Sequence, residues 1–331
     1  MRKISGFILS LLLFSIGKER KEKPSSTYKP SVTVLIPAFN EEAVITATIR
    51  SVQAQTYPVE EIIVVDDCSL DRTAQIAASL VTKVVRTHCN TGTKSRALNF
   101  GTSFVHTEVV VNVDADTVLD PKAIEYLIPA LSDGKTLCAS GFVIPQRIKN
   151  FWEMARLVQY LYYLRIHKSA QVHWQSSLVA SGCFSALNTA ILKELGGFPE
   201  GNMAEDMALT WKAHLVGKKV KFVPQAVCYP KDPSNWKQYR SQVTRWYRGF
   251  LQCIADNRTH LAKKPRLAFF VLWYLLSGIS QPLFLGAFAY MLVSRLWLKG
   301  ELALVLSGAI TFEICVVFAT AFFWRHSVQA A

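Results

Sequence analysis

The feature that most constrains this sequence is the alternation of short apolar segments with amphipathic ones between residues 32 and 113. Strand patterns cover Val32–Ile36, Ile62–Val65, Val84–Val85 and Val109–Val113. Helix patterns lie between them, over Glu41–Ala54, Thr73–Leu80 and Ser95–Phe104. Strands that alternate with helices predict an α/β fold in which a mostly parallel sheet is flanked by helices on both faces.

Two residues set the expected end of the first strand and the start of the first helix. Pro37 has no N–H to donate to a sheet, so we expect the strand to stop at Ile36. Asn40 is expected to cap the helix that begins at Glu41, since asparagine accepts hydrogen bonds from free N–H groups at helix starts.

Acidic and polar residues follow three of the expected strands. Asn40 and Glu41 follow the first, Asp67 the second, and Asp114 and Asp116 the fourth. Ligands bind outside the carboxyl ends of parallel strands, so these side chains are expected to share one crevice. Two carboxylates spaced as in 114–116 repel each other unless a cation lies between them, and oxygen ligands suit Mg²⁺ or Mn²⁺. An ordinary solvated strand end is the alternative for this pair taken alone.

Apolar and charged residues are segregated along the chain. Half of the 331 residues are hydrophobic, yet the net charge is +13. Three apolar stretches stand out, namely Ile4–Gly17, Leu267–Val293 and Leu302–Trp324. The first is short for a spanning helix and is expected to be an anchor, a thin span or an interfacial helix, whereas the other two are long enough to cross a bilayer. Basic residues at the ends of these stretches flank the block between them, which predicts an integral membrane protein whose catalytic domain is cytosolic.

The expected organisation has three parts. Residues 1–30 form an N-terminal membrane anchor and linker, residues 31–255 a cytosolic domain, and residues 256–331 a C-terminal membrane region with about two transmembrane helices. Seven cysteines without a CxxC pair favour reduced thiols over a disulfide framework or a zinc site. Contact with anionic lipid explains the positive charge better than nucleic-acid binding, which places basic residues beside exposed aromatic platforms.

Ordered motifs across residues 31–255 resemble the inverting family-2 glycosyltransferases, notably the membrane synthases of poly-N-acetylglucosamine, chitin, hyaluronan and cellulose. The motifs are IPAFNEE (36–42), VVDDCSLDRT (64–73), the Lys94–Leu98 segment, DAD (114–116), SGCFSALN (181–188), GGFPEGNMAEDMALT (196–210) and QVTRW (242–246). The resemblance implies a GT-A-type nucleotide-sugar-binding domain, together with interfacial and transmembrane helices.

The same resemblance implies where a sugar donor and a metal ion bind. The implied donor-binding residues are Pro37, Ala38, Asn40, Glu41, Asp67, Lys94, Asp114, Gln242 and Arg245. Asp114 and Asp116 are the implied ligands of Mg²⁺ or Mn²⁺. For Lys94 a solvated lysine is the alternative, and for the helix Trp236–Ile254, which carries QVTRW, the alternative is an amphipathic helix lying on a membrane surface.

On the acceptor side, the resemblance implies that Asp206 is the catalytic base. The implied acceptor-binding residues are Glu205, Trp246, Ser181, Gly182 and Cys183. Inversion at an anomeric carbon needs a base that removes the proton of the attacking hydroxyl. As an alternative, Glu205 and Asp206 serve the free N–H groups in the first turn of the helix Met207–His214, and residues 181–183 form a buried turn.

The resulting expectation is a membrane-bound inverting enzyme that adds sugars from a UDP-sugar, by resemblance N-acetylglucosamine, to a growing β-linked polysaccharide. One alternative is transfer of a single sugar to a lipid acceptor. A catalytically silent membrane binding subunit is an alternative of a different class. The expected partners are the donor, a glycan or lipid acceptor, membrane lipids, and a second copy of the chain or a secretion partner, with no nucleic acid.

Overall fold

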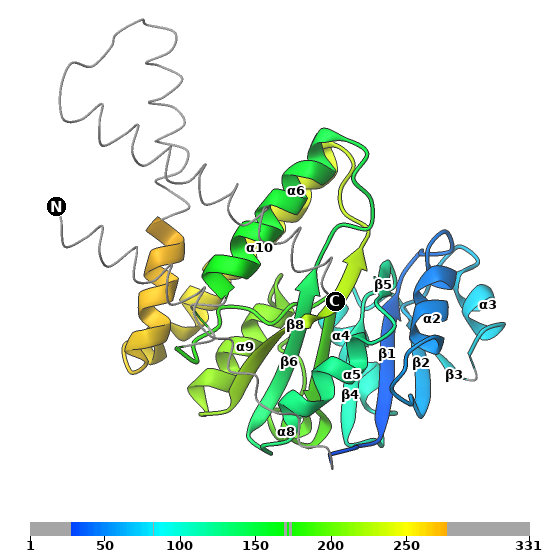
Figure 1. Ribbon diagram of the computed structural model, residues 1–331, viewed down its shortest axis with the longest axis horizontal. Coiled ribbons are helices and arrows are strands. Elements are labelled where there is room, and N and C mark those ends of the chain that lie inside the picture. The colour runs from blue at the N-terminus through cyan, green and yellow to red at the C-terminus, as the bar shows by residue number, and fades with distance from the viewer. Residues whose placement is uncertain (1–27, 82, 169–170, 172–173, 277–331) are drawn as a thin grey trace, which may run out of the picture.

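The computed structural model of the protein describes residues 28–81, 83–168, 171 and 174–276. Eight strands form one sheet in the order β3-β2-β1-β4-β7-β6-β8-β5, and helices cover both of its faces (Figure 1). The first half of the fold comprises β1 (Val32–Ala38), α2 (Ile45–Gln53), β2 (Glu61–Asp66), α3 (Thr73–Ala78), β3 (Lys83–Arg86), α4 (Lys94–Thr102) and β4 (Val109–Val113).

The second half is less regular in its order of strands and helices. It comprises β5 (Thr117–Leu119), α5 (Ala123–Leu127), η1 (Ile128–Leu131), β6 (Thr136–Val143), α6 (Phe151–Tyr162), η2 (Tyr163–Lys168), β7 (Phe184–Asn188), α8 (Thr189–Glu194), α9 (Glu205–Leu215), β8 (Lys219–Pro230) and α10 (Trp236–Leu261). Ring contacts between Trp152 and Trp236 show that α6 and α10 lie side by side, and both extend past the end of the sheet (Figure 1).

Alternating side chains along the central strands build a separate core on each face of the sheet. Val34 and Ile36 of β1 belong to one apolar cluster, which includes residues of α2, α5 and α6. Leu35 belongs to the other, with residues of α4, α8 and α9. Side chains in a strand point to opposite faces in turn, so one buried strand supports both layers.

The predicted strands β1 to β4 are confirmed, but the sheet is mixed. β1 pairs with β2 and β4, and β2 with β3, all in parallel. β7 is antiparallel to both β4 and β6, and β5 is antiparallel to β8. The expectation of a mostly parallel sheet is therefore confirmed for β1 to β4. In the C-terminal half only β6 and β8 are parallel, and β7 and β5 run antiparallel to their neighbours.

Two local predictions at the end of β1 are wrong. The strand continues through Pro37 to Ala38, and this is possible because β4 pairs with β1 only as far as Leu35, so Pro37 has a partner strand on one side alone. Asn40 does not cap a helix, since α2 begins at Ile45 and the Asn40 side chain accepts a hydrogen bond from Leu70 N–H at 2.8 Å.

The C-terminal described segment, residues 265–276, is helical and packs against α9 and α10. Within the described ranges, no helix has the length and apolar character needed to cross a membrane. The expected membrane segments Ile4–Gly17 and Leu302–Trp324 lie outside the described residues, as does residue 277 onward of Leu267–Val293.

Candidate active site

The loops after β1 and β2 are held together by hydrogen bonds at the carboxyl end of the sheet. The backbone N–H of Asn40 donates to Ser69 Oγ at 3.0 Å, and that of Glu41 donates to Thr73 Oγ1 at 2.8 Å. Asn40 has a positive φ of 56°, a conformation that asparagine tolerates better than most residues. The predicted donor-binding residues Asn40 and Glu41 therefore lie on a braced edge, next to the buried end of β2.

Asp67 is tied to the loop that precedes α4. Its Oδ1 accepts from Thr87 Oγ1 and Thr91 N–H, each at 2.9 Å, and its Oδ2 accepts from Thr91 Oγ1 at 2.9 Å. Its own backbone N–H donates to Ala38 O at 2.9 Å. The carboxylate thus fastens Thr87 and Thr91 to the end of β2, and the backbone of Asp67 is joined to Ala38 at the end of β1.

Asp114 follows β4 directly and is paired with Lys94, the first residue of α4. The Lys94 ammonium forms an ion pair with Asp114, donates to Gly182 O at 2.9 Å, and lies 3.5 Å from Glu205 Oε1. Burial favours the neutral amine, but the carboxylates of Asp114 and Glu205 outweigh it and raise the pKa of Lys94. Lys94 is therefore not a solvated lysine, because it lies between two of the predicted site carboxylates.

Asp116 is partly buried near two other carboxylates, those of Asp114 and Glu41. Burial, together with the charges of Asp114 and Glu41, raises its pKa to about 7. Glu41 also has a raised pKa, through burial and the nearby Asp114. The backbone between the two aspartates is fixed by α2, since Thr48 Oγ1 donates to Ala115 O at 2.7 Å.

Gly182, in the segment before β7, links the Asp114 side of the site to Asp206. Its carbonyl accepts from Lys94 Nζ and from Asn112 Nδ2, the latter at 2.6 Å, while its N–H donates to Asp206 Oδ2 at 2.9 Å. Ser181 and Cys183 flank it, with their side-chain Oγ and Sγ atoms 3.2 Å apart. The predicted acceptor segment therefore contacts the predicted base.

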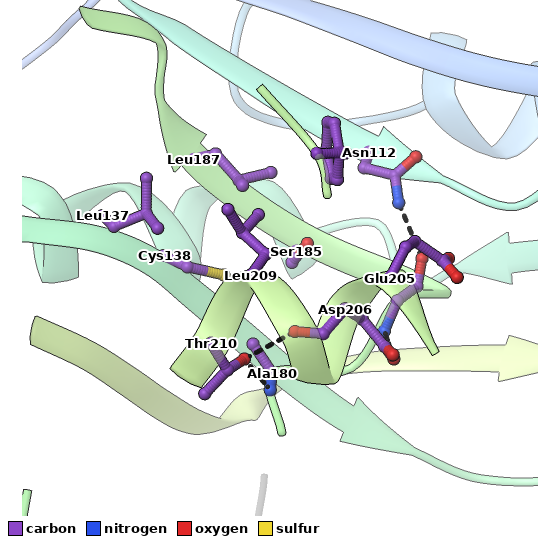
Figure 2. Close-up of a pocket in the computed structure, with 12 residues that line it drawn as sticks. Asn112, Leu137, Cys138, Ala180, Ser185, Leu187, Glu205, Asp206, Leu209 and Thr210 are labelled. Atoms are coloured by element: carbon purple, nitrogen blue, oxygen red, sulfur yellow. Dashed lines mark hydrogen bonds between the residues drawn. The ribbon is translucent and has the colours of Figure 1, made fainter. Parts of the chain in front are cut away.

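Asp206 lies in the first turn of α9 beside a small cavity. Its Oδ1 accepts from Met207 N–H at 2.8 Å. The cavity, of about 10 Å³, has room for about one water molecule, and its wall includes the apolar residues Leu137, Leu187 and Leu209 (Figure 2). Burial and the neighbouring Glu205 raise the pKa of Asp206 to about 6, against the opposing charges of Lys94 and Arg245.

Only part of the carboxylate cluster lines this cavity. Glu205, Asp206 and Gly182 line it, whereas Asp114, Asp116 and Arg245 do not. The carboxylates are joined instead by contacts through Lys94 and Gly182, and by charge, since Arg245 acts on the pKa values of both Asp114 and Asp206.

α10 approaches the start of α9 closely enough to bring Arg245 to the acidic pair. A Cβ atom on Gly249 would lie 2.5 Å from the Cβ of Ala204, the residue just before Glu205. Arg245 Nη1 donates to Met203 O at 3.1 Å, and its side chain is exposed. The structure thus brings this arginine of QVTRW beside the acidic pair, and Gly249 is a contact point between helices.

Gln242 and Trp246 are held by a residue that the sequence did not indicate. Arg156 of α6 donates to Gln242 Oε1, and its guanidinium carbon lies 4.8 Å from the centre of the Trp246 ring. An arginine inside an amphipathic helix gives no sequence signal of this kind, because the contact joins positions 86 residues apart. Lys231 was also missed, although a basic residue directly after β8 is a usable signal, and it acts on the pKa of Glu41.

The predicted metal ligands provide two close carboxylates. Among the described residues, no group of three or more His, Cys, Asp or Glu side chains is arranged to hold a metal ion. Asp114 and Asp116 nevertheless offer oxygen donors that suit a divalent cation, since burial raises the pKa values of both and the charge of Asp114 raises that of Asp116 further. Mg²⁺ commonly binds through one or two carboxylates together with phosphates of a substrate.

Comparison with known proteins extends these observations. The family described as glycosyl transferase family 2 matches residues 33–196. A probable glycosyltransferase of Bacillus subtilis, YdaM, is 32% identical over 231 residues, which cover 66% of this chain and 55% of that protein. A poly-β-1,6-N-acetyl-D-glucosamine synthase of Staphylococcus epidermidis is 29% identical over 251 residues, covering 73% and 60% respectively. The chain therefore spans somewhat more than half the length of these relatives.

Solved structures share the fold. A mannosyltransferase from Pyrobaculum calidifontis, in complex with GDP-mannose and Mn²⁺, superposes with a TM-score of 0.64 at 21% identity, covering 96% of this chain and 95% of that one. Residues 1–349 of Staphylococcus aureus TarS, in complex with UDP-GlcNAc, give a TM-score of 0.53 at 20% identity, covering 73% and 71%. With the motifs gathered at the carboxyl end of the sheet, the family match over residues 33–196 shows that the chain contains a glycosyl transferase family 2 domain.

Proposed function

We propose that the protein transfers a sugar, by likeness to its relatives N-acetylglucosamine, from a UDP-sugar to a hydroxyl of a growing β-linked polysaccharide. The observation that carries this proposal is the chain of contacts from Asp114 through Lys94 and Gly182 to Asp206. These contacts join Asp114 and Lys94, which suit the binding of a nucleotide diphosphate, to Asp206, whose carboxylate suits the activation of an acceptor hydroxyl. The relatives named as poly-β-1,6-N-acetylglucosamine synthases support the choice of sugar.

Asp206 acts as the base in this proposal. A carboxylate whose pKa is about 6 is mostly ionised at neutral pH and is still basic enough to accept a proton. It takes the proton of the acceptor hydroxyl as that oxygen forms a bond to the anomeric carbon and the bond to UDP breaks. Gly182 N–H and Met207 N–H each donate to one oxygen of this carboxylate, so its orientation is fixed before the acceptor arrives.

Two cations of the chain balance the charge of the donor. Lys94 lies beside Asp114 and Glu205, and Arg245 is exposed beside the acidic pair. A guanidinium suits phosphate oxygens because it can donate two parallel hydrogen bonds. In this proposal Arg245 binds the diphosphate. The positive charge of Lys94 offsets the carboxylates of Asp114 and Glu205, which would otherwise repel the diphosphate.

Asp114 and Asp116 hold Mg²⁺ or Mn²⁺ in this proposal. A divalent ion held by these two carboxylates would supply positive charge to offset the negative charge of the leaving nucleotide. The raised pKa values of both aspartates support this assignment, because burial and neighbouring carboxylates disfavour their ionised forms, which a bound cation would stabilise.

We further propose that the enzyme is held at a membrane with its catalytic domain in the cytosol. Apolar stretches at both ends of the sequence support this, with basic residues on their inner flanks. Exposed apolar side chains on the helix of residues 265–276 also support it, namely Phe269, Leu272, Trp273 and Leu276.

The test is to incubate membranes that contain the full chain with a panel of UDP-sugars and Mg²⁺ or Mn²⁺, and to size the product by mass spectrometry. A ladder of N-acetylglucosamine oligomers with release of UDP is expected. A single glycolipid as the product would instead support the alternative, in which one sugar is transferred to a lipid acceptor. Absence of UDP release with every donor, from correctly folded protein, would contradict the proposal of enzymatic transfer.

A further inference from the structure

A fully buried arginine lies between α6 and the QVTRW segment of α10. The side chain of Arg156 has no exposed surface, and its Nε lies 3.4 Å from Oδ1 of Asp232, whose side chain is 2% exposed. Nη1 donates to Gln159 Oε1 at 2.6 Å. A guanidinium removed from water in this way is tolerated only when its charge is paired and its N–H groups are hydrogen-bonded.

Two residues of the QVTRW segment contact this guanidinium. Nη2 donates to Gln242 Oε1, and the guanidinium carbon lies 4.8 Å from the centre of the Trp246 ring. It also lies 4.7 Å from the centre of the Tyr239 ring. A guanidinium is planar, so it can stack on rings with its face and donate hydrogen bonds at its edge. One side chain of α6 therefore fixes both a ring and an amide on α10.

The contact with Gln242 sets the orientation of its amide. Arginine has five N–H donors and no acceptor, so Gln242 has to turn its carbonyl oxygen toward Arg156. The Nε2 amide is then the end of the side chain that remains for a ligand. An N–H donor in that place suits an oxygen-rich ligand such as the hydroxyl groups of a sugar.

Asp232 connects the arginine to Asp116, the residue directly before β5. Tyr160 Oη donates to Asp232 Oδ1 at 3.0 Å, on the same oxygen that Arg156 approaches. The neighbouring Lys231 donates its backbone N–H to Asp116 O at 3.1 Å. The buried cation therefore ties the QVTRW segment to the chain segment beside the proposed metal ligands.

We infer that Arg156 is a positioning residue for the acceptor, holding Trp246 as a flat platform and Gln242 with its amide N–H₂ toward the terminal sugars of a glycan. Gln242 is thereby placed on the acceptor side, in place of the donor side that the family resemblance implies. The inference rests on the proposed function and adds to it a residue outside every motif of the sequence. Arg156 does not touch the reacting atoms, so its loss weakens acceptor binding and leaves donor binding in place.

The test uses a conservative change, because removing the charge would leave the buried Asp232 without an opposite charge beside it and endanger folding. Arg156→Lys keeps a cation beside Asp232 but loses the planar stacking and the paired donors. Arg248→Lys is the matched control, since Arg248 is exposed and lies on the opposite side of α10 from Tyr239 and Trp246. Thermal midpoints of the full-length variants report on folding.

The first measurement is calorimetric binding of a four-unit N-acetylglucosamine oligomer, which needs no turnover, and of UDP with Mn²⁺. Arg156→Lys should weaken oligomer binding about tenfold, with UDP binding and the thermal midpoint close to those of the wild type and of Arg248→Lys. Equal oligomer affinity in Arg156→Lys and the wild type overturns the inference, as does failure of the wild type to bind the oligomer. Oligomer binding without any transfer would contradict the proposed function alone.

The second measurement separates positioning from general support of the fold. If Arg156 acts through Gln242 and Trp246, then Arg156→Lys should have little further effect on oligomer affinity in a Gln242→Ala, Trp246→Ala background, because coupled residues are not additive. A full additional loss in that background would show that Arg156 does not act through them. Gln242→Glu should keep the contact with Arg156 and the thermal midpoint, yet weaken oligomer binding, because the N–H₂ donor is gone.

Discussion

The backbone N–H of Gly182 donates to Asp206 Oδ2 at 2.9 Å, and a Cβ atom on Gly182 would lie 2.8 Å from the same oxygen. The two residues are 24 positions apart in the sequence, and their contact leaves no room for a side chain at Gly182. The contact holds one carboxylate oxygen, while Met207 N–H holds the other. The proposed base is thus fixed by the backbone of two different segments.

Gly182→Ala should lower turnover about tenfold or more, because the added methyl group pushes the carboxylate out of line and misplacement of a reacting group is costly. The φ of Gly182 is not positive, so alanine brings no backbone strain. UDP binding and the thermal midpoint should change little. Steady-state kinetics with calorimetry checks this, and normal turnover would show that the contact does not constrain the base.

Turnover should fall as the pH drops below about 6. Asp206 acts in its ionised form, and its pKa of about 6 means that acidification protonates it and removes the base. A pH profile of UDP release at saturating substrates measures this limb. A flat profile down to pH 5, with the protein still folded, would contradict the assignment of Asp206.

Lys94→Met should move this acidic limb to higher pH. The positive charge of Lys94 lowers the pKa of Asp206, so its loss lets that pKa rise and the base is protonated earlier as the pH falls. Lys94→Arg keeps the charge and is the control, with a limb expected near that of the wild type. A limb that stays in place in Lys94→Met would mean that the lysine does not act on the base.

Much of the N-terminal half follows from the sequence. β1, β2 and β4 are buried runs bounded by polar residues, and their parallel order follows from the helices between them. Lys94, Asp114 and Asp206 were predicted as site residues from motifs, and the structure brings them together through Gly182.

The rest depends on contacts between distant positions, which no local pattern encodes. The directions of β5 to β8 follow from long connections without regular alternation. The Asn40 side chain accepts a hydrogen bond from the backbone N–H of Leu70, 30 positions away, and this contact competes with its use as a helix cap. Arg156 meets Gln242 across 86 positions, so a local pattern shows only an arginine in an amphipathic helix.

Gly249→Ala should destabilise the protein by about 1–3 kcal/mol, since a methyl group 2.5 Å from Ala204 Cβ overpacks the contact between α10 and α9. Turnover should fall as well, because Arg245 and Glu205 flank this contact. Ala204→Gly in the same chain should recover part of both losses by removing the facing methyl group. Chemical denaturation and UDP-release assays check this. A stabilised Gly249→Ala variant would mean that its helix propensity outweighs the contact.

Asp116→Ala should abolish the part of UDP binding that depends on Mn²⁺. Without this carboxylate only Asp114 of the pair remains, and chelation of Mn²⁺ should then have little effect on UDP affinity. Asp256→Ala, which removes an exposed carboxylate of α10, is the control. Calorimetric titration with UDP, with and without Mn²⁺, provides the measurement. Unchanged dependence on Mn²⁺ in Asp116→Ala would show that the ion binds elsewhere.

The most direct test of the central claim, that Asp206 is a base beside a nucleotide-binding carboxylate cluster, is Asp206→Asn. The variant keeps the size of the side chain and an oxygen that can accept from Gly182 N–H. Transfer from UDP-N-acetylglucosamine should fall about 100-fold or more, while the affinity for UDP with Mn²⁺ stays within about twofold of the wild type. Near-normal transfer by Asp206→Asn, or loss of UDP binding together with transfer, would contradict the account.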